Sequence, residues 1–288
     1  NRLYVGMAPS DGSQTHVLVV DCESDSIVDS VYGQGWETGF YNLTAGPSPG
    51  MLIVVNYGIH KILDTRSNSL IASLESAFSG FAFFPEYGRF VGGGADRLVV
   101  FDDTTYGIRH TFGREMRNCK RVGNSTRVIA QTHLNTSPSP PGAMIIYDVP
   151  NEAVVDSLVV DPLQNGTGFV FTSYFAEFDI SLDGSRVYGF GHDATGNYVI
   201  GFDIVQRTTL FKYSTPTRDA QGSAFVSPDG REVWVTWGGP DIFGCYYPQS
   251  IHILDAFSGQ LVDTIDVSGI ALGQDNFAGP VQVRFLPD

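Results

Sequence analysis

The segment Ile251-His-Ile-Leu-Asp255 is a short run of branched or aromatic residues that is closed by an aspartate. Five more segments end in the same way, at residues 16–21, 60–64, 98–102, 144–148 and 199–203. Successive aspartates lie 38 to 55 residues apart. Such a period indicates an array of supersecondary units, with each unit forming one repeat of the fold.

Each repeat contains further strand-like runs on both sides of its aspartate. A run such as Gln260-Leu-Val-Asp-Thr-Ile265 follows the aspartate, and a pair of runs such as Ala224-Phe-Val-Ser-Pro-Asp-Gly-Arg-Glu-Val-Trp-Val235 precedes it. Alternation with period two marks half-buried strands, and Asp-Gly supplies the glycine that a hairpin turn needs. Four antiparallel strands, A to D, therefore make one repeat. The six repeats predict an all-β fold, in which residues 1–288 form a single β-propeller domain of six four-stranded sheets.

The two ends of the chain complete one repeat. The chain opens inside a strand B, Arg2-Leu-Tyr-Val5, and closes with a strand A, Val281-Gln-Val-Arg-Phe285. Joined end to end, these segments read like the hairpin at residues 225–235. We therefore expect the N-terminal and C-terminal strands to pair, which leaves the propeller without an open sheet edge.

The repeats resemble those of the YVTN-type β-propeller family, which occurs in surface-layer-like and other secreted proteins of prokaryotes. The resemblance covers essentially the whole chain. Its matching residues are Arg2-Leu-Tyr-Val-Gly6, Val17-Leu-Val-Val-Asp-Cys22, Ser24-Asp-Ser-Ile-Val-Asp-Ser-Val31, Ser227-Pro-Asp-Gly230 and Ile253-Leu-Asp-Ala-Phe-Ser-Gly-Gln-Leu-Val-Asp-Thr-Ile265. Many such propellers have seven blades, so seven four-stranded blades are the alternative to six. The resemblance implies a fold much more than a function.

Composition and short motifs limit the kinds of partner that the protein can bind and its location in or outside the cell. The formal charge of −14 and the pI near 4.6 argue against nucleic acid, whose phosphates would be repelled. No run approaches the eighteen or so apolar residues that span a bilayer. The chain begins with Asn1, which suggests a processed or trimmed precursor. Three Asn-x-Thr/Ser triplets fit the N-glycosylation pattern, at Asn42, Asn124 and Asn165. We expect an extracellular, cell-surface or periplasmic glycoprotein, although such triplets also arise by chance.

The long connections of the predicted propeller all fall on one face. In this fold the D–A and B–C connections share a face, and the long ones here are residues 8–15, 132–142, 160–174, 237–250 and 267–280. Extended loops on a rigid scaffold commonly carry binding residues. We therefore predict that this face, which we call the loop face, is the binding surface.

The loop face collects one carboxylate for each blade. These carboxylates are Glu37, Glu75, Glu115, Glu177, Asp219 and Asp275. If they point toward the axis, they form a ring that would attract calcium, which takes several oxygen ligands. The alternative, which we favour, is that they cap turns or face solvent, because no compact Asp-x-Asp-x-Asp loop fixes a ligand geometry. We expect no cofactor, with calcium as the exception if the ring forms.

Two histidines differ from the other four. His16, His60, His110 and His252 lie at or near strands C and D and are interpreted as structural. His133 and His192 each follow a strand B, and a histidine with a carboxylate partner could act as a base or a metal ligand. The predicted pocket at the mouth of the channel comprises His133, His192, Asp193, Arg218, Asp219, Trp237 and Asp241. The alternative, which we favour, is that the two histidines lie in these loops by coincidence.

Two loops have an unusual composition. Residues 134–142 are proline-rich and therefore stiff. Residues 237–248 carry several aromatic rings, Trp237 and Tyr246 among them. Exposed aromatic rings beside a rigid loop suggest a docking surface for a partner or a second copy. Packing over the blade edges explains them about equally well.

The six repeated aspartates are expected to be structural. Each lies where a strand ends, and an aspartate there accepts backbone N–H groups in an Asx turn. One architectural need recurs in every repeat, whereas an active site occurs once.

Two function classes remain open. We favour a non-catalytic extracellular or cell-surface module that binds protein, glycan or a copy of itself, because the chain contains no nucleophile elbow, clustered metal motif or phosphate loop. The alternative is an enzyme or enzyme subunit, either a lactonase-like hydrolase or a periplasmic dehydrogenase subunit, with its site at the axial mouth.

Overall fold

The computed structural model describes thirteen segments of the chain. They are residues 2–7, 16–24, 26–32, 40–56, 59–75, 78–94, 97–112, 116–132, 143–159, 178–193, 196–214, 221–238 and 250–266. The chain forms two compact units, Asn1–Glu115 and Met116–Asp288. The prediction of a single domain over residues 1–288 stays a prediction.

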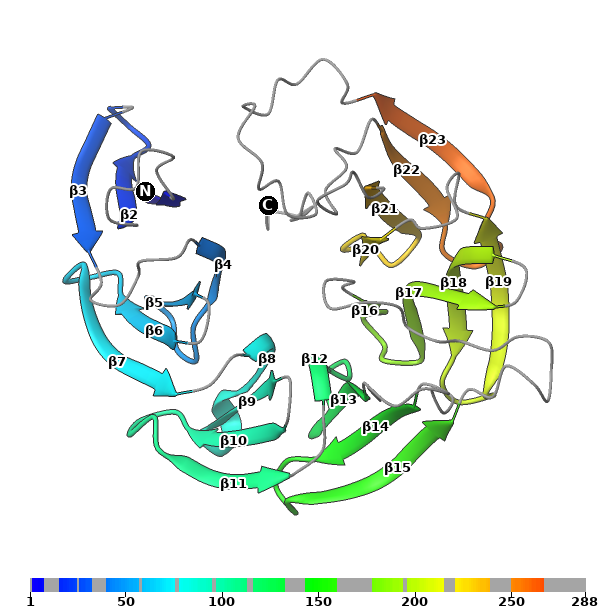
Figure 1. Cartoon of the computed structure of the whole chain (residues 1–288), viewed down its shortest axis with the longest axis horizontal. Coiled ribbons are helices and arrows are strands. Elements are labelled where there is room, and N and C mark those ends of the chain that lie inside the picture. The colour runs from blue at the N-terminus through cyan, green and yellow to red at the C-terminus, as the bar shows by residue number, and fades with distance from the viewer. Residues whose placement is uncertain are drawn as a thin grey trace. The chain divides into compact units, whose positions relative to one another are not determined.

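The first unit contains three antiparallel sheets, and in each sheet the strands follow one another in chain order (Figure 1). The first sheet is formed by β1 (Arg2–Met7), β2 (His16–Asp21) and β3 (Ser26–Tyr32). The second is formed by β4 (Phe40–Ala45), β5 (Met51–Asn56), β6 (Ile59–Asp64) and β7 (Ser69–Glu75). The third is formed by β8 (Phe78–Phe84), β9 (Arg89–Gly94), β10 (Leu98–Asp102) and β11 (Ile108–Phe112).

The second unit repeats this plan in three four-stranded sheets. The fourth sheet of the chain is formed by β12 (Met116–Arg121), β13 (Arg127–Thr132), β14 (Ala143–Asp148) and β15 (Ala153–Val159). The fifth is formed by β16 (Asp179–Ile180), β17 (Arg186–Asp193), β18 (Gly196–Asp203) and β19 (Thr208–Ser214). The sixth is formed by β20 (Gln221–Val226), β21 (Glu232–Gly238), β22 (Ser250–Asp255) and β23 (Leu261–Asp266).

The predicted repeat of four antiparallel strands is confirmed in five sheets, and the predicted number of six sheets is also confirmed. The first sheet has three strands among the described residues, and residues 281–285, which were predicted to complete it, lie outside them. Pairing of the chain ends therefore stays a prediction. In the described part of the chain the one helical element is a short 3-10 turn, η1 (Pro85–Tyr87), and no helix there is long and apolar enough to cross a membrane.

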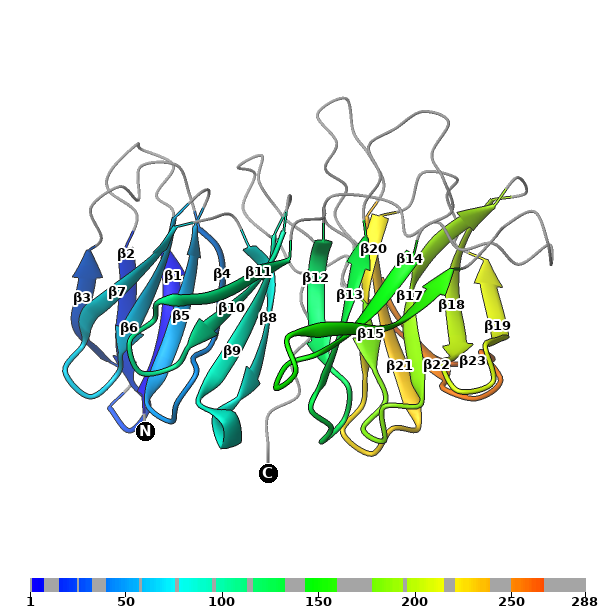
Figure 2. The same ribbon diagram turned by 90° about the horizontal axis from the view of Figure 1, so that it is seen from below.

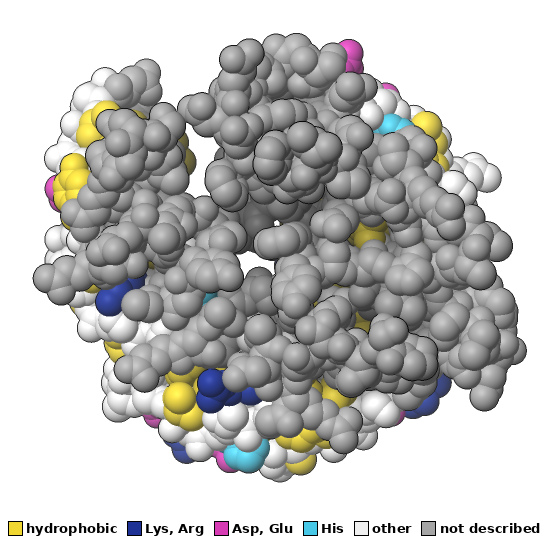
Figure 3. Space-filling view, in the orientation of Figure 1, with side chains coloured by type: hydrophobic (Ala, Val, Ile, Leu, Met, Phe, Trp, Pro, Cys, Tyr) yellow, Lys and Arg dark blue, Asp and Glu magenta, His cyan; other side chains and the backbone are white. Residues whose placement is uncertain are grey.

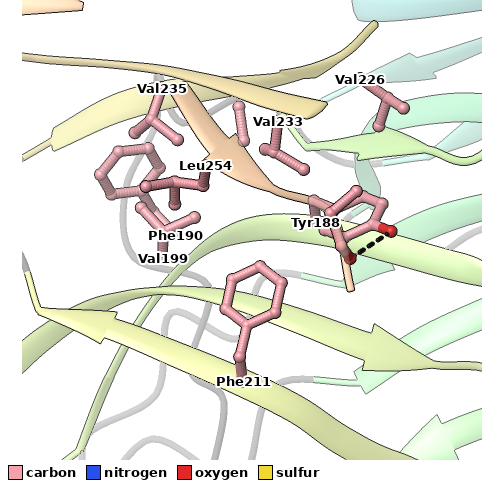
Figure 4. Close-up of a cluster of buried hydrophobic side chains, with 10 residues drawn as sticks. Tyr188, Phe190, Val199, Phe211, Val226, Val233, Val235 and Leu254 are labelled. Carbon is pink, nitrogen blue, oxygen red and sulfur yellow. Dashed lines mark hydrogen bonds between the residues drawn. The ribbon is translucent and has the colours of Figure 1, made fainter. Parts of the chain in front are cut away.

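Apolar side chains fill the space between consecutive sheets of each unit. In the second unit, Phe190 and Val199 of the fifth sheet pack against Val235 and Leu254 of the sixth (Figure 4). The same layer contains Tyr188, whose hydroxyl donates to the carbonyl oxygen of Ala256 at 3.0 Å. Since each strand presents alternate residues to the two faces of its sheet, the period of two in the sequence produces these layers.

The six repeated aspartates form the predicted Asx turns. The Oδ1 atom of each accepts a backbone N–H from the residue two or three positions further on, at 2.7 to 3.3 Å. These backbone hydrogen bonds lower the pKa of the carboxyl groups of Asp21, Asp64, Asp102 and Asp255. The aspartates therefore hold the turn between the last two strands of each sheet.

A β-bulge interrupts the pairing of the last two strands in all six sheets. In the sixth sheet, for example, Ile253 faces Asp263 but Leu254 faces Leu261, so Val262 is the extra residue. The same register shift occurs in the other five sheets. Bulges twist an edge strand and make it a poor template for pairing with another chain.

Candidate functional site

The loop face lies largely outside the described residues. The predicted site residues that fall there are Glu37, Glu115, His133, Glu177, Arg218, Asp219, Asp241, Tyr246 and Asp275, together with the glycosylation candidate Asn165. For five others the structure places the backbone and not the side chain, namely Asn42 in β4, Glu75 in β7, His192 and Asp193 in β17, and Trp237 in β21. The predicted pocket and carboxylate ring therefore stay predictions.

Metal ligands do not cluster in the described segments. No group of three or more histidine, cysteine, aspartate or glutamate side chains that could hold a metal ion occurs among them. The six carboxylates of the predicted calcium ring all lie outside the described side chains, so this result leaves the calcium prediction where it stood.

In the second unit the backbone of three predicted site residues is described at strand ends of the loop face. His192 and Asp193 end β17 and face Asn197 and Gly196 across the hairpin to β18. Trp237, near the end of β21, faces Gly222 of β20. In Figure 2 the turn between β22 and β23 lies at the lower end of the strands, and β19 runs to the upper end. Strand ends that lead into long connections thus lie opposite the Asx turns.

A chain of three polar side chains joins the fifth and sixth sheets at this end. The Tyr213 hydroxyl lies 2.8 Å from Nδ1 of His252, and Nε2 of His252 lies 3.1 Å from the Ser250 hydroxyl oxygen. Ser250 and His252 are two residues apart on β22, so their side chains share one face of the strand. Tyr213 reaches this face from β19 of the neighbouring sheet. All three side chains are half-buried.

Burial shifts the pKa of the two titratable groups among these three side chains, His252 and Tyr213. Desolvation lowers the pKa of His252 from its ordinary value of 6.5 and raises the pKa of Tyr213. The imidazole is therefore neutral at neutral pH, with one nitrogen available as an acceptor. The cross-strand neighbours on β23 are Asp266 opposite Ser250 and Thr264 opposite His252. The site thus combines a hydroxyl, a neutral imidazole and a phenol.

The sequence analysis interpreted His252 as structural and did not predict its contacts with Tyr213 and Ser250. The pattern Ser-x-His inside a strand was a local signal, because alternation places both side chains on one face. Tyr213 gave no comparable signal, since it lies 39 residues earlier and meets His252 through packing of two sheets.

Asn124 is the glycosylation candidate whose side chain is described. It is exposed in the turn between β12 and β13. The next two hydroxyl groups are used by the fold: Ser125 Oγ donates to the carbonyl oxygen of Val122 at 2.6 Å, and Thr126 Oγ1 donates to Asp148 at 3.1 Å. An N-linked glycan on Asn124 would therefore leave these two hydrogen bonds in place. Glycosylation itself stays a prediction.

The outer strands expose many apolar side chains. Exposed residues on the last strand of each sheet include Ile27, Val28, Ile71, Ile108, Val155 and Val262. Yellow atoms mark this apolar surface over β3 in Figure 3. Scattered apolar residues are normal on a protein surface, but a repeated stripe on outer strands favours contacts along the flanks.

Comparison with known proteins defines the fold. No protein-family model and no curated protein sequence matches the chain. Hydrazine synthase of Kuenenia stuttgartiensis matches with a TM-score of 0.66 and 13% identity, over 92% of this chain and 83% of that one. The β-propeller domain of Cps50 (Swd1) of Myceliophteria thermophila matches with a TM-score of 0.64 and 12% identity, over 92% of this chain and 89% of that one.

At such low sequence identity these similarities show the fold and say nothing about activity. The YVTN resemblance of the repeats stays a prediction, because no family model matches. Together with the six antiparallel sheets, the comparisons identify the fold as an all-β propeller.

Proposed function

We propose that the protein is a recognition module of the cell exterior, which binds a protein, a glycan or a second copy of itself through its loop face. One observation carries this proposal. The Asx turns at one end of the sheets are short and bonded internally, whereas the strands at the other end lead into long connections, such as the one between β21 and β22. Rigid sheets that present variable loops are a common way of building a binding surface.

Charge limits the kind of partner. A formal charge of −14 favours neutral or cationic surfaces and disfavours nucleic acid and other polyanions. The apolar stripe on the outer strands could add contacts along the flanks, as in self-association. Association with a cationic partner should therefore weaken as salt concentration rises.

The loop face can be tested with two matched double variants. Trp237→Ala with Tyr246→Ala removes two rings from the predicted docking loop. Val205→Ala with Phe257→Ala removes two exposed side chains, 77% and 56% exposed, from the Asx-turn end of the same unit. We expect the first pair alone to reduce binding on a glycan array or self-association in analytical ultracentrifugation. Equal binding by wild type and the first pair would contradict the proposal.

The predicted location has its own test. Intact mass of protein from its native source, before and after treatment with a glycosidase, reports directly on export through a glycosylating compartment. We expect carbohydrate on Asn124, because this side chain is exposed in a turn. A mass equal to that of the bare chain would argue against the glycoprotein prediction.

A second candidate is a hydrolase, which was the alternative in the sequence analysis. The observation in its favour is the contact between the Ser250 hydroxyl and His252 Nε2, because a serine beside a neutral imidazole is a pair used in acyl transfer. Both residues of this pair lie on β22, the third strand of the sixth sheet, whereas the sequence analysis expected an enzymatic site at the axial mouth. The pair is assessed below.

A further inference from the structure

The Ser250–His252–Tyr213 chain is unlike the repeated features of the fold. The position three residues before the repeated aspartate carries His252 in the sixth sheet. In the other five sheets it carries Leu18, Lys61, Val99, Ile145 and Ile200. An architectural requirement would recur, as the Asx turns do, and this combination occurs in one sheet. The propeller therefore does not need it.

The geometry is that of a nucleophile, a base and a group that orients the base. The Ser250 oxygen is within hydrogen-bond reach of Nε2 at 3.1 Å, and Tyr213 is within reach of Nδ1 at 2.8 Å. If Nδ1 carries the proton and donates it to the Tyr213 oxygen, the lone pair of Nε2 points at the serine hydroxyl. That tautomer is the one a general base needs.

The backbone holds the three groups in register. His252 is paired on both edges of β22, with Val235 of β21 and Thr264 of β23, and Ser250 is paired with Asp266 of β23. The apolar contacts of Phe211 and Leu254, two residues from Tyr213 and His252 respectively, hold β19 against β22. Tyr213, Ser250 and His252 are half-buried at the loop face, so each keeps part of its surface in contact with solvent.

From these observations we propose that Ser250 is a nucleophile that accepts an acyl group from small esters or lactones, with His252 as its general base and Tyr213 as a positioning residue. This inference goes beyond recognition at the loop face and does not depend on it, because an ester probe reports on Ser250 whether or not a partner binds.

The reaction has two balanced steps. In the first, Ser250 Oγ bonds to the carbonyl carbon while its proton moves to Nε2 of His252; the ester C–O bond breaks, and Nε2 returns the proton to the departing oxygen as the alcohol leaves. In the second, water attacks the acyl carbon, His252 accepts its proton, and the bond to Ser250 breaks to release the acid. The serine then recovers the proton from His252.

The direct test uses a fluorophosphonate probe, which marks nucleophilic serines covalently, and p-nitrophenyl acetate as substrate. We expect one label for each wild-type chain, at Ser250 by peptide mapping. Ser250→Ala should abolish the label. His252→Gln should slow labelling about 100-fold or more, the usual contribution of a general base. The matched control Ser214→Ala changes an exposed serine at the end of β19 and should label like the wild type.

Tyr213→Phe separates positioning from a merely structural contact. It keeps the ring and removes the hydroxyl, so kcat for p-nitrophenyl acetate should fall about 10-fold while KM is unchanged, because the tautomer of His252 matters only in the chemical step. A structural role alone would lower the melting temperature without lowering kcat. A label on any other residue, or wild-type labelling no faster than that of Ser250→Ala, would overturn the proposal.

Discussion

Arg207 Nη2 donates to both carboxylate oxygens of Asp156, at 3.0 and 2.8 Å, and so joins the fourth and fifth sheets. The same positions make a contact in the first unit, where Asn68 Nδ2 donates to Asp29 Oδ2 at 2.8 Å. Arg207 and Asn68 both have positive φ, 57° and 51°, and each directly precedes the fourth strand of its sheet. The left-handed residue of the turn thus contacts the bulged strand of the preceding sheet.

The Arg207–Asp156 pair should contribute little to stability and much of that contribution should depend on salt. Its side chains are 57% and 40% exposed, so we expect a coupling free energy of about 0.5 kcal/mol at low salt. A double-mutant cycle with Arg207→Ala and Asp156→Ala, measured by urea unfolding, checks this value. The coupling free energy should fall toward zero at about 1 M salt, where charges are screened. A coupling that is indifferent to salt would contradict an exposed ion pair.

Gly259 occupies the same turn position in the sixth sheet and should tolerate no side chain. Its φ is +68°, and a Cβ there would lie 2.3 Å from Phe211 ring atoms of the fifth sheet. Gly259→Ala should therefore lower the free energy of unfolding by about 2 to 4 kcal/mol, from left-handed strain and overpacking together. Gly230 is the matched control, because its φ is +72° and nothing lies within 4 Å of a Cβ. Gly230→Ala should cost about 1 kcal/mol, and equal losses at the two sites would refute the packing argument.

Acid should destabilise the turn at Asp183 in a defined pH window. The Ser181 hydroxyl, which donates to Oδ1 at 2.5 Å, and the N–H of Ser185 lower the pKa of Asp183 to about 2. Because this pKa is below the unfolded value of 3.8, the contribution to stability is complete above pH 3.8 and is lost as the pH falls toward 2.

Asp183→Asn keeps an acceptor oxygen and removes the titration, so unfolding free energy should depend less on pH in this window. Ser181→Ala removes the largest cause of the shift and should also reduce the dependence. If both variants lose stability between pH 4 and 2 as steeply as the wild type, Asp183 does not titrate as described.

Much of the fold could be predicted from sequence because its signals are local. Asp255, for instance, contacts backbone groups two and three residues away, so the repeated aspartates were interpretable without knowledge of packing. The bulges and the contact of Asn68 with Asp29 could not be predicted in this way. That contact spans 39 residues and depends on how two sheets pack.

The candidate site shows the same division. Ser250 and His252 are two residues apart on a strand, a pattern visible in the sequence, whereas Tyr213 meets them through the contact of β19 with β22. His252 was interpreted as structural because it lies within a strand C, and nothing in the sequence indicated its contact with Tyr213. Side chains of the loop face, such as His133 and Asp219, lie outside the described residues and remain sequence predictions.

His252 should make stability fall in mild acid. Burial lowers its pKa below 6.5, so the unfolded chain binds a proton more readily than the folded one. The contribution of the neutral form is complete above pH 6.5 and is lost as the pH falls through the folded pKa. His252→Gln should remove this part of the pH dependence in urea unfolding between about pH 7 and pH 5.

Tyr213→Phe is the control that distinguishes burial from hydrogen bonding as the cause. It keeps the aromatic ring that covers His252, whose centroid lies 6.0 Å from the imidazole, and removes only the hydroxyl. Since burial lowers the pKa, the Phe variant should keep the slope of stability against pH that His252→Gln loses. A slope that disappears in both variants would show instead that the Tyr213 hydroxyl holds the imidazole neutral.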